Sequence, residues 1–189
     1  LQGALLVSLD PVPALDLKRQ YASMKEDIDA AVRRVIESGW HISGPETKAF
    51  EQEYAAYCGV VQAIALGSGS AALNLTLRAL DVGPGDEVIT VSFTLSATLD
   101  AIIELGATPV LVDVEPETYT MDASQVAAKI TPRTKAIMPV NIYGHPADFD
   151  AIAAAVPGVP MVIDACESHG ASYKGKPATM FGTASCFSF

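Results

Sequence analysis

The sequence has few basic residues, few cysteines and no long apolar run. Twelve Lys and Arg against 22 Asp and Glu leave a net charge of −10, which argues against a polyanion such as nucleic acid as the main partner. Three cysteines, an odd number without metal-ligand spacing, favour a reduced compartment over a disulfide framework. Charged residues interrupt every stretch that could approach the ~20 apolar residues of a membrane-spanning helix. We expect a cytoplasmic protein that binds no metal, no membrane and no nucleic acid.

The amino-terminal segment, LQGALLVSLDPVPALDLK, is apolar but lacks the basic start and the clear cleavage site of a signal peptide. The chain begins without Met and stops on the strand-like CFSF, and both ends read as trimmed. Its 189 residues, half of them hydrophobic, are enough to bury one sizeable core.

Two helices are predicted before residue 60. Apolar residues recur at spacings of three and four, with Asp16 as a candidate cap and Gly39 behind: Tyr21, Met24, Ile28, Val32 and Val35. SGPETKAFEQEYAAYCG predicts a shorter helix closed by Gly59. Residues 1–60 therefore form an amino-terminal arm with helices.

From Val61 the chain alternates short apolar strands with helices of about ten residues. The predicted strands are VQAIAL, the EVITV of GPGDEVITV, TPVLVDV, KAIMPV and MVID, and the helices between them include ASQVAAKI and DFDAIAAAV. Alternation of this kind is typical of βαβ units, so residues 61–189 are expected to form a three-layer α/β/α domain with a mainly parallel sheet. The turn-rich final stretch, SYKGKPATMFGTASCFSF, predicts a hairpin-like return to the sheet.

Ligands of open α/β sheets bind at the carboxyl ends of the strands. Three polar stretches follow predicted strands there: Gly67–Ala71, Ser92–Thr98 and Asp164–His169. The sequence therefore places all three at one rim.

The stretch GSGSAAL is a glycine-rich turn that opens a helix. The amides of Gly69, Ser70 and Ala71 at the positive end of the helix dipole would suit a phosphate monoester. The pattern is neither GxGxxG nor a P-loop. A tight turn in which Ser70 only caps the helix fits the pattern equally well.

Asp164 ends a predicted core strand, where an ionised carboxylate is costly without a partner. A structural Asp that caps the following turn is the commoner fate of such a residue. The functional alternative needs a buried cation. The protonated pyridine nitrogen of pyridoxal 5′-phosphate (PLP) would be one, and that cofactor also brings the phosphate that the glycine turn suits.

The order and spacing of several segments resemble the DegT/DnrJ/StrS family of sugar aminotransferases from about Asp16 to Phe189. The segments are GSGSAALNLTLRALDVGPGDEVITVSFTLSATLDAIIELGATPVLVDVEPETYTMD, ITPRTKAIMPV, YGHPADFDAI and DACESHGASYKGKPATMFGTASCFSF. The resemblance implies the large domain of a fold-type-I PLP enzyme without its carboxyl-terminal small domain. It implies a homodimer with active sites at the subunit interface. It also implies conversion of a nucleotide-linked keto sugar to an amino sugar, with glutamate as donor.

Carried over residue by residue, the resemblance assigns the cofactor phosphate to the turn Gly69, Ser70 and Ala71 and to Ser188. Asp164 matches the partner of the pyridinium nitrogen. These assignments come from the motifs that the residues match.

The resemblance places Glu167 near the ring hydroxyl and the reacting carbon, and Cys166 where a small residue packs against one ring face. Leu95 stands where the family usually has an aromatic ring that stacks on the cofactor, and it offers apolar contact without π-stacking. Strand alternation points Phe93 the other way, so weaker cofactor binding is the expected consequence.

The Schiff-base lysine of the family would lie just beyond Phe189. Lys174 and Lys176 occupy a YKGK turn whose lysines are structural in the family. His169 and Tyr143 are interpreted as packed core or supporting residues rather than as catalytic groups.

Three functions stay open at this point. The first is the sugar aminotransferase. The second is a deoxysugar dehydratase of the same superfamily, in which histidine replaces the lysine. The third is a cofactor-free sensing or scaffolding module, which the missing lysine and Leu95 favour. The sequence ends inside a family motif, which favours the first function, the sugar aminotransferase.

Overall fold

The computed structural model describes residues 12–189 and divides the chain into two compact units, one ending at Ala49 and one spanning Phe50–Phe189. Residues 1–11, which include most of the segment interpreted above as unlike a signal peptide, lie outside the described part. The predicted domain division at residue 60 stays a prediction.

Helix α1, Leu17–Ser38, begins and ends at the caps that the sequence predicted. The Asp16 side chain accepts a hydrogen bond from the Arg19 backbone N–H at 3.0 Å. Gly39 follows with φ of +64° and donates its N–H to the Ile36 carbonyl. Helix α2, Pro45–Cys58, ends before Gly59, whose φ is +68°. Both predicted helices are confirmed.

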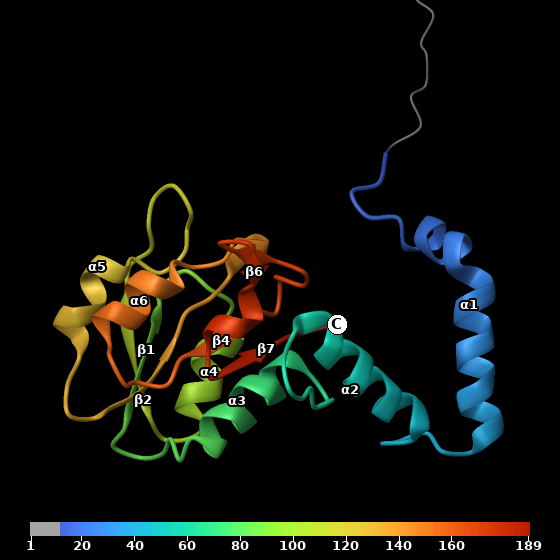
Figure 1. Ribbon diagram of the computed structural model, residues 1–189, viewed down its shortest axis with the longest axis horizontal. Helices are drawn as coiled ribbons and strands as arrows, with labels where there is room; N and C mark the ends of the chain where they lie inside the picture. Colours follow the sequence, from blue (N-terminus) through green and yellow to red (C-terminus); the bar gives the residue numbers. More distant parts are fainter. Residues whose placement is uncertain (1–11) are drawn as a thin grey trace, which may run out of the picture. The chain divides into compact units, whose positions relative to one another are not determined.

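The second unit contains a parallel sheet (Figure 1). Its strands are β1 Glu87–Val91, β2 Thr108–Val112, β3 Thr134–Met138, β4 Val162–Asp164 and β7 Ala184–Cys186. Strand β1 lies between β2 and β3, and β4 pairs with β7, all in parallel. Isolated bridges from Ile137 to Met161 and from Val140 to Asp164 join β3 to β4. The order is therefore β2-β1-β3-β4-β7.

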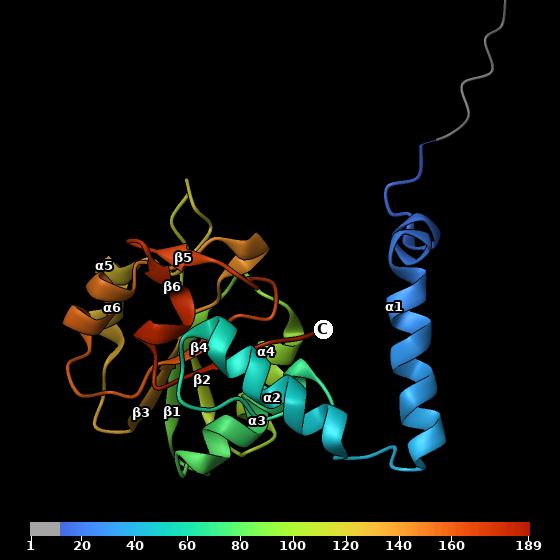
Figure 2. The same ribbon diagram turned by 45° about the vertical axis from the view of Figure 1, so that its right-hand side comes forward.

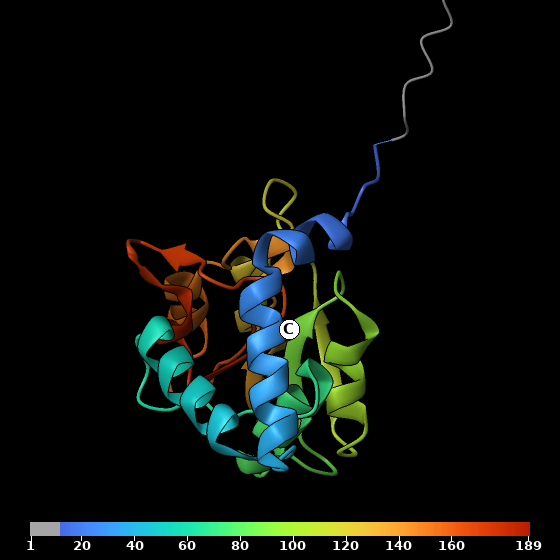
Figure 3. The same ribbon diagram turned by 90° about the vertical axis from the view of Figure 1, so that its right-hand side faces the viewer.

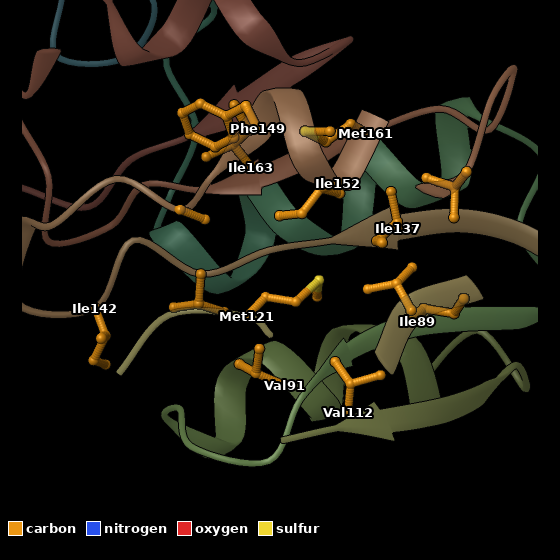
Figure 4. Close-up of a cluster of buried hydrophobic side chains, with 14 of the residues drawn as sticks. Ile89, Val91, Val112, Met121, Ile137, Ile142, Phe149, Ile152, Met161 and Ile163 are labelled. Atoms are coloured by element: carbon orange, nitrogen blue, oxygen red, sulfur yellow. The ribbon is translucent and has the colours of Figure 1, made fainter. Parts of the chain in front are cut away.

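Helices cover both faces of the sheet, which confirms the three-layer α/β/α fold (Figures 1 and 2). They are α3 Gly69–Ala79 and α4 Ser96–Ile103 on one face, and α5 Ala123–Val126 and α6 Phe149–Ala155 on the other. Alternate strand residues point to opposite faces. Accordingly, Ile89, Ile137 and Ile163 pack with the α5 and α6 side (Figure 4). Their neighbours Val88 and Val162 pack with the α3 and α4 side.

The short elements fill the connections. They are the hairpin β5 Ser172–Tyr173 and β6 Lys176–Pro177, and the 3-10 turns η1 Ala127–Lys129, η2 Ile142–Gly144 and η3 Ala178–Phe181. The hairpin leads through η3 to β7, which confirms the predicted return to the sheet. The loop between β2 and α5 projects from the sheet (Figures 1 and 3).

Two predicted elements differ from the structure. Residues 61–66 are not a strand, because a strand needs a neighbouring backbone and no segment within residues 12–189 pairs with them. The Ala65 N–H is instead bound by the Glu51 carboxylate at 2.8 Å. The helix predicted over ASQVAAKI is a single α-helical turn that continues as η1.

In the described part of the chain, no helix is long and apolar enough to cross a membrane. Within residues 12–189, no group of three or more His, Cys, Asp or Glu side chains is arranged to hold a metal ion.

At the amino end of β1, the sheet buries a carboxylate that should make stability depend on pH. Glu87 is 6% exposed and accepts hydrogen bonds from the Thr131 hydroxyl and the Arg133 guanidinium. These bonds lower the pKa of Glu87 below its ordinary value, the Thr131 bond most of all. A lowered pKa in the folded state gives stability that is complete above the ordinary value near 4.5 and lost as the pH falls below it.

Glu87→Gln should therefore lower the Tm by roughly 2–4 °C at pH 7. The difference from wild type should shrink between pH 5 and pH 3, which thermal unfolding across that range can measure. Replacement of the exposed Glu53 by Gln is the control. A Glu87→Gln deficit that stays constant down to pH 3 would contradict the assignment.

Candidate functional site

The candidate site lies at the carboxyl ends of β1 and β4 and at the start of α3. A parallel sheet brings the carboxyl ends of its strands to one edge, as the sequence predicted for Ser92–Thr98 and Asp164–His169. Within the residues that the structure describes, Gly67–Ala71 follows no strand and leads into α3 instead. Cys166 connects the end of β4 with the start of α3. Its N–H donates to the Asp164 carboxylate, and its thiol lies against Gly69.

Asp164 is the last residue of β4 and is only 5% exposed. Its backbone is held by the segment after β3: the N–H donates to the Pro139 carbonyl, and the carbonyl accepts from the Asn141 N–H, both at 2.9 Å. One carboxylate oxygen accepts from the Thr98 hydroxyl at 2.8 Å, and the other accepts from the Cys166 N–H at 3.3 Å. The carboxylate is thus buried rather than solvated, and rigidly oriented.

Thr98 ends the stretch Ser92–Thr98 that the sequence places at the rim, but the sequence assigns it no role of its own. It lies in the first turn of α4, is 1% exposed, and its hydroxyl binds both the Asp164 carboxylate and the Thr94 hydroxyl, at 2.8 and 2.7 Å. The available signal was a pair of threonines four residues apart directly after a core strand. Thr98 lies in α4, which follows β1, whereas Asp164 ends β4. The spacing of residues along the sequence could therefore not identify this hydrogen-bonded pair.

The start of α3 differs in detail from the prediction. Ser68, not Ser70, is the N-cap, and its hydroxyl accepts from the Ala71 N–H at 3.1 Å. The alternative in which Ser70 caps the helix is therefore wrong. In the described part of the chain, the amides of Gly69 and Ser70 have no hydrogen-bond partner, and the Ser70 side chain is exposed. These two amides, rather than that of Ala71, are free to bind an anion at the positive end of the helix dipole.

Gly69 is buried at a close contact between three segments. A Cβ there would lie 2.8 Å from the Cys166 sulfur and 2.9 Å from the Ser188 Cβ. Only glycine lets α3 begin this close to the segment after β7 and to the turn after β4. Burial raises the pKa of the Cys166 thiol, and the Asp164 charge raises it further. The contact of its thiol with Gly69 and its raised pKa favour a packed thiol over a reactive thiolate.

Glu167 and Leu95 lie on the exposed rim. A Glu167 carboxylate oxygen accepts from the Tyr143 N–H at 2.8 Å. The Tyr143 side chain is 75% exposed, so of its two interpretations, core or supporting residue, the core one is wrong; its φ is +52°. Leu95, the residue before α4, is 73% exposed and free to contact a ligand. The Phe93 ring contacts the Tyr143 ring, with the centroids 6.2 Å apart. That Phe93 points away from Leu95 stays a prediction.

The remaining titratable candidates have structural partners. Both ring nitrogens of His169 are hydrogen-bonded, one to the Tyr54 hydroxyl and one to the Ser188 carbonyl, each at 2.8 Å. His169 is nevertheless exposed and is not a core residue. Lys174 pairs with Asp150 on the hairpin side, which fits its structural interpretation.

The comparisons with known proteins agree on one family. The family model for the DegT/DnrJ/EryC1/StrS aminotransferases matches residues 22–189. The chain is 48% identical over 177 residues to a UDP-2-acetamido-2-deoxy-3-oxo-D-glucuronate aminotransferase of Pseudomonas aeruginosa, which covers 93% of this chain and 49% of that protein. It is 47% identical over 180 residues to the erythromycin biosynthesis sensory transduction protein EryC1 of Saccharopolyspora erythraea, covering 94% and 49%.

Among solved structures, S. venezuelae DesV in complex with a ketimine intermediate superposes with a TM-score of 0.88 at 44% identity. The match covers 93% of this chain and 47% of that one. The chain thus spans about half the length of the curated relatives it matches. Its second unit has the large-domain fold of these PLP-dependent enzymes. The chain belongs to the DegT/DnrJ/EryC1/StrS aminotransferase family.

Proposed function

We propose that the protein containing this chain is a PLP-dependent aminotransferase of a nucleotide-linked keto sugar, with L-glutamate as amino donor. The observation that carries the proposal is the buried, doubly hydrogen-bonded Asp164 carboxylate, which is joined through Cys166 to a helix start with two free amides. A homodimer and a cytoplasmic location remain predictions of the same proposal.

The residues present fit the cofactor. When bound, PLP supplies an electron sink that stabilises negative charge on the carbon that exchanges its amino group. The carboxylate of Asp164 would hold a proton on the ring nitrogen, because a buried anion favours a neighbouring cation. Thr98 keeps that carboxylate oriented and offsets part of the cost of its burial.

The phosphate would be held by the amides of Gly69 and Ser70 and by the hydroxyls of Ser70 and Ser188. Ala71 contributes through the helix dipole rather than through its own amide, which Ser68 occupies. Leu95 and Cys166 would provide apolar contact to the ring faces, and Glu167 would stand near the ring hydroxyl.

The base that exchanges the proton is proposed to be a lysine beyond Phe189, which would also hold the cofactor covalently. Lys174 pairs with Asp150, which supports a structural role for Lys174. The names of the aminotransferases among the relatives favour UDP- or dTDP-linked keto sugars as substrates.

A second function, sensing or regulation, is favoured by one observation. Two relatives, at 47% and 44% identity, are named a sensory transduction protein and a pleiotropic regulatory protein. The buried carboxylate favours the enzyme over this alternative, because it would be costly to keep without a cationic ligand.

The test uses the complete protein with PLP, glutamate and a panel of UDP- and dTDP-linked keto sugars. An aminotransferase gives the absorbance of a protonated Schiff base, loses it with glutamate, and regains it as an amino sugar forms. Noncovalent binding with loss of a sugar hydroxyl would identify the dehydratase. Absence of saturable PLP binding would support the regulatory module.

A further inference from the structure

Aromatic rings gather where α2 meets the segment that follows β7. The Tyr54 ring lies 5.3 Å from the Phe187 ring and 5.2 Å from the Phe189 ring, both edge-on. The imidazole of His169 lies 4.6 Å from the Phe189 ring. Figures 1 and 2 show the chain end, marked C, beside α2. His169 is therefore held between α2 and the residues that follow β7.

The hydrogen bonds of His169 determine which of its nitrogens carries the proton. The Ser188 carbonyl oxygen, 2.8 Å from Nε2, can only accept, so Nε2 is protonated. In the neutral imidazole, Nδ1 then accepts from the Tyr54 hydroxyl at 2.8 Å. Burial raises the pKa of Tyr54, which keeps that hydroxyl protonated and able to donate. A single chain of donors thus runs from Tyr54 through His169 to Ser188.

This series of hydrogen bonds ends at Ser188, the residue that faces Gly69. The Ser188 hydroxyl lies 3.3 Å from the position that a Cβ of Gly69 would occupy. A hydrogen bond to the Ser188 carbonyl restrains the backbone of that residue, and with it the direction of its side chain. Ser188 lies in no helix or strand, and its carbonyl is the acceptor of the His169 hydrogen bond.

We propose that His169, oriented by Tyr54, is a positioning residue that holds the Ser188 hydroxyl at the start of α3 and so completes an anion-binding site there. The proposal rests on the proposed function, in which the anion is the phosphate of PLP. His169 itself touches no substrate and moves no proton in the reaction.

Ring packing alone would give His169 and Tyr54 a purely structural role, and the experiment separates the two. In the complete protein, Tyr54→Phe keeps the ring and removes only the hydroxyl. His169→Leu removes both hydrogen bonds, whereas His169→Gln keeps an amide N–H near the position of Nε2. Tyr57→Phe, an exposed ring on the same helix, is the matched control.

The readout is the ratio of the dissociation constants for PLP and for pyridoxal, which lacks the phosphate. His169→Leu should weaken PLP binding roughly 10-fold, the size of one hydrogen bond to a charged group, and leave pyridoxal binding within about 2-fold. Tyr54→Phe should weaken PLP binding roughly 3-fold. His169→Gln should come within about 3-fold of wild type, and Tyr57→Phe should match it.

Equal losses for PLP and pyridoxal, or no loss for either, would overturn the proposal. If the wild-type protein binds no PLP, the proposed function fails. The positioning role of His169 is then tested by the effect of inorganic phosphate on the Tm. Phosphate that raises the Tm of wild type and His169→Gln but not of His169→Leu supports the positioning role. A phosphate response that is absent, or the same in all three, overturns it.

Discussion

Asp164→Asn is expected to lower kcat of the complete enzyme by roughly 100-fold or more, the usual cost of removing one preorganised electrostatic group. Asparagine has nearly the same shape and can still accept from the Thr98 hydroxyl, which donates to Asp164 at 2.8 Å. It carries no charge, so it would not hold a proton on the cofactor's ring nitrogen. Steady-state rates with glutamate and a keto sugar measure the loss.

Asp164→Asn should lower kcat but should not lower the stability of the protein. Asp164 is a buried anion, so a neutral amide removes the cost of burying a charge, which offsets the loss of the bond from the Cys166 N–H, and the Tm without cofactor should stay equal or rise. Asp100→Asn, on the exposed side of α4, should change neither quantity. A kcat within 3-fold of wild type for Asp164→Asn would remove the residue from the proposed chemistry.

Gly69→Ala should weaken PLP binding at least 10-fold and lower the Tm, although alanine is the better helix former. Ala replacing Gly within a helix normally stabilises it by about 1 kcal/mol. Here the added Cβ would lie 2.8 Å from the Cys166 sulfur and 2.9 Å from the Ser188 Cβ, and overpacking of this kind costs roughly 1–3 kcal/mol. The displaced Ser188 would also leave the phosphate site. Cofactor titration and thermal unfolding measure the two effects.

Gly67→Ala is the matched control, because nothing lies within 4 Å of a Cβ at that position. It should leave binding unchanged and the Tm equal or slightly raised. Adding Cys166→Ala to Gly69→Ala removes the sulfur contact but not the Ser188 contact, so the double variant should recover part of the loss. Identical behaviour of Gly67→Ala and Gly69→Ala would show that α3 does not need the close approach.

The layered fold was predictable because its signal is local. Strands such as Glu87–Val91 and Val162–Asp164 are short and apolar, and helices separate them at regular spacing. The prediction failed where a segment depends on a distant backbone, as at residues 61–66, which no strand within residues 12–189 pairs with. It also left open whether Tyr143 is a core or a supporting residue, and the exposed side chain excludes the core.

The sequence by itself determined where the first helices begin and end, that short strands alternate with helices, and which polar turns meet at one edge of the sheet. Periodicity and capping chemistry act over a few residues, so these features can be read along the chain. Only the tertiary structure decided that Thr98 donates to Asp164, that Ser68 rather than Ser70 caps α3, and that Gly69 lies against Cys166 and Ser188. Two of these contacts join residues far apart in the chain, and the cap lies one turn away. All three depend on where packing places the side chains.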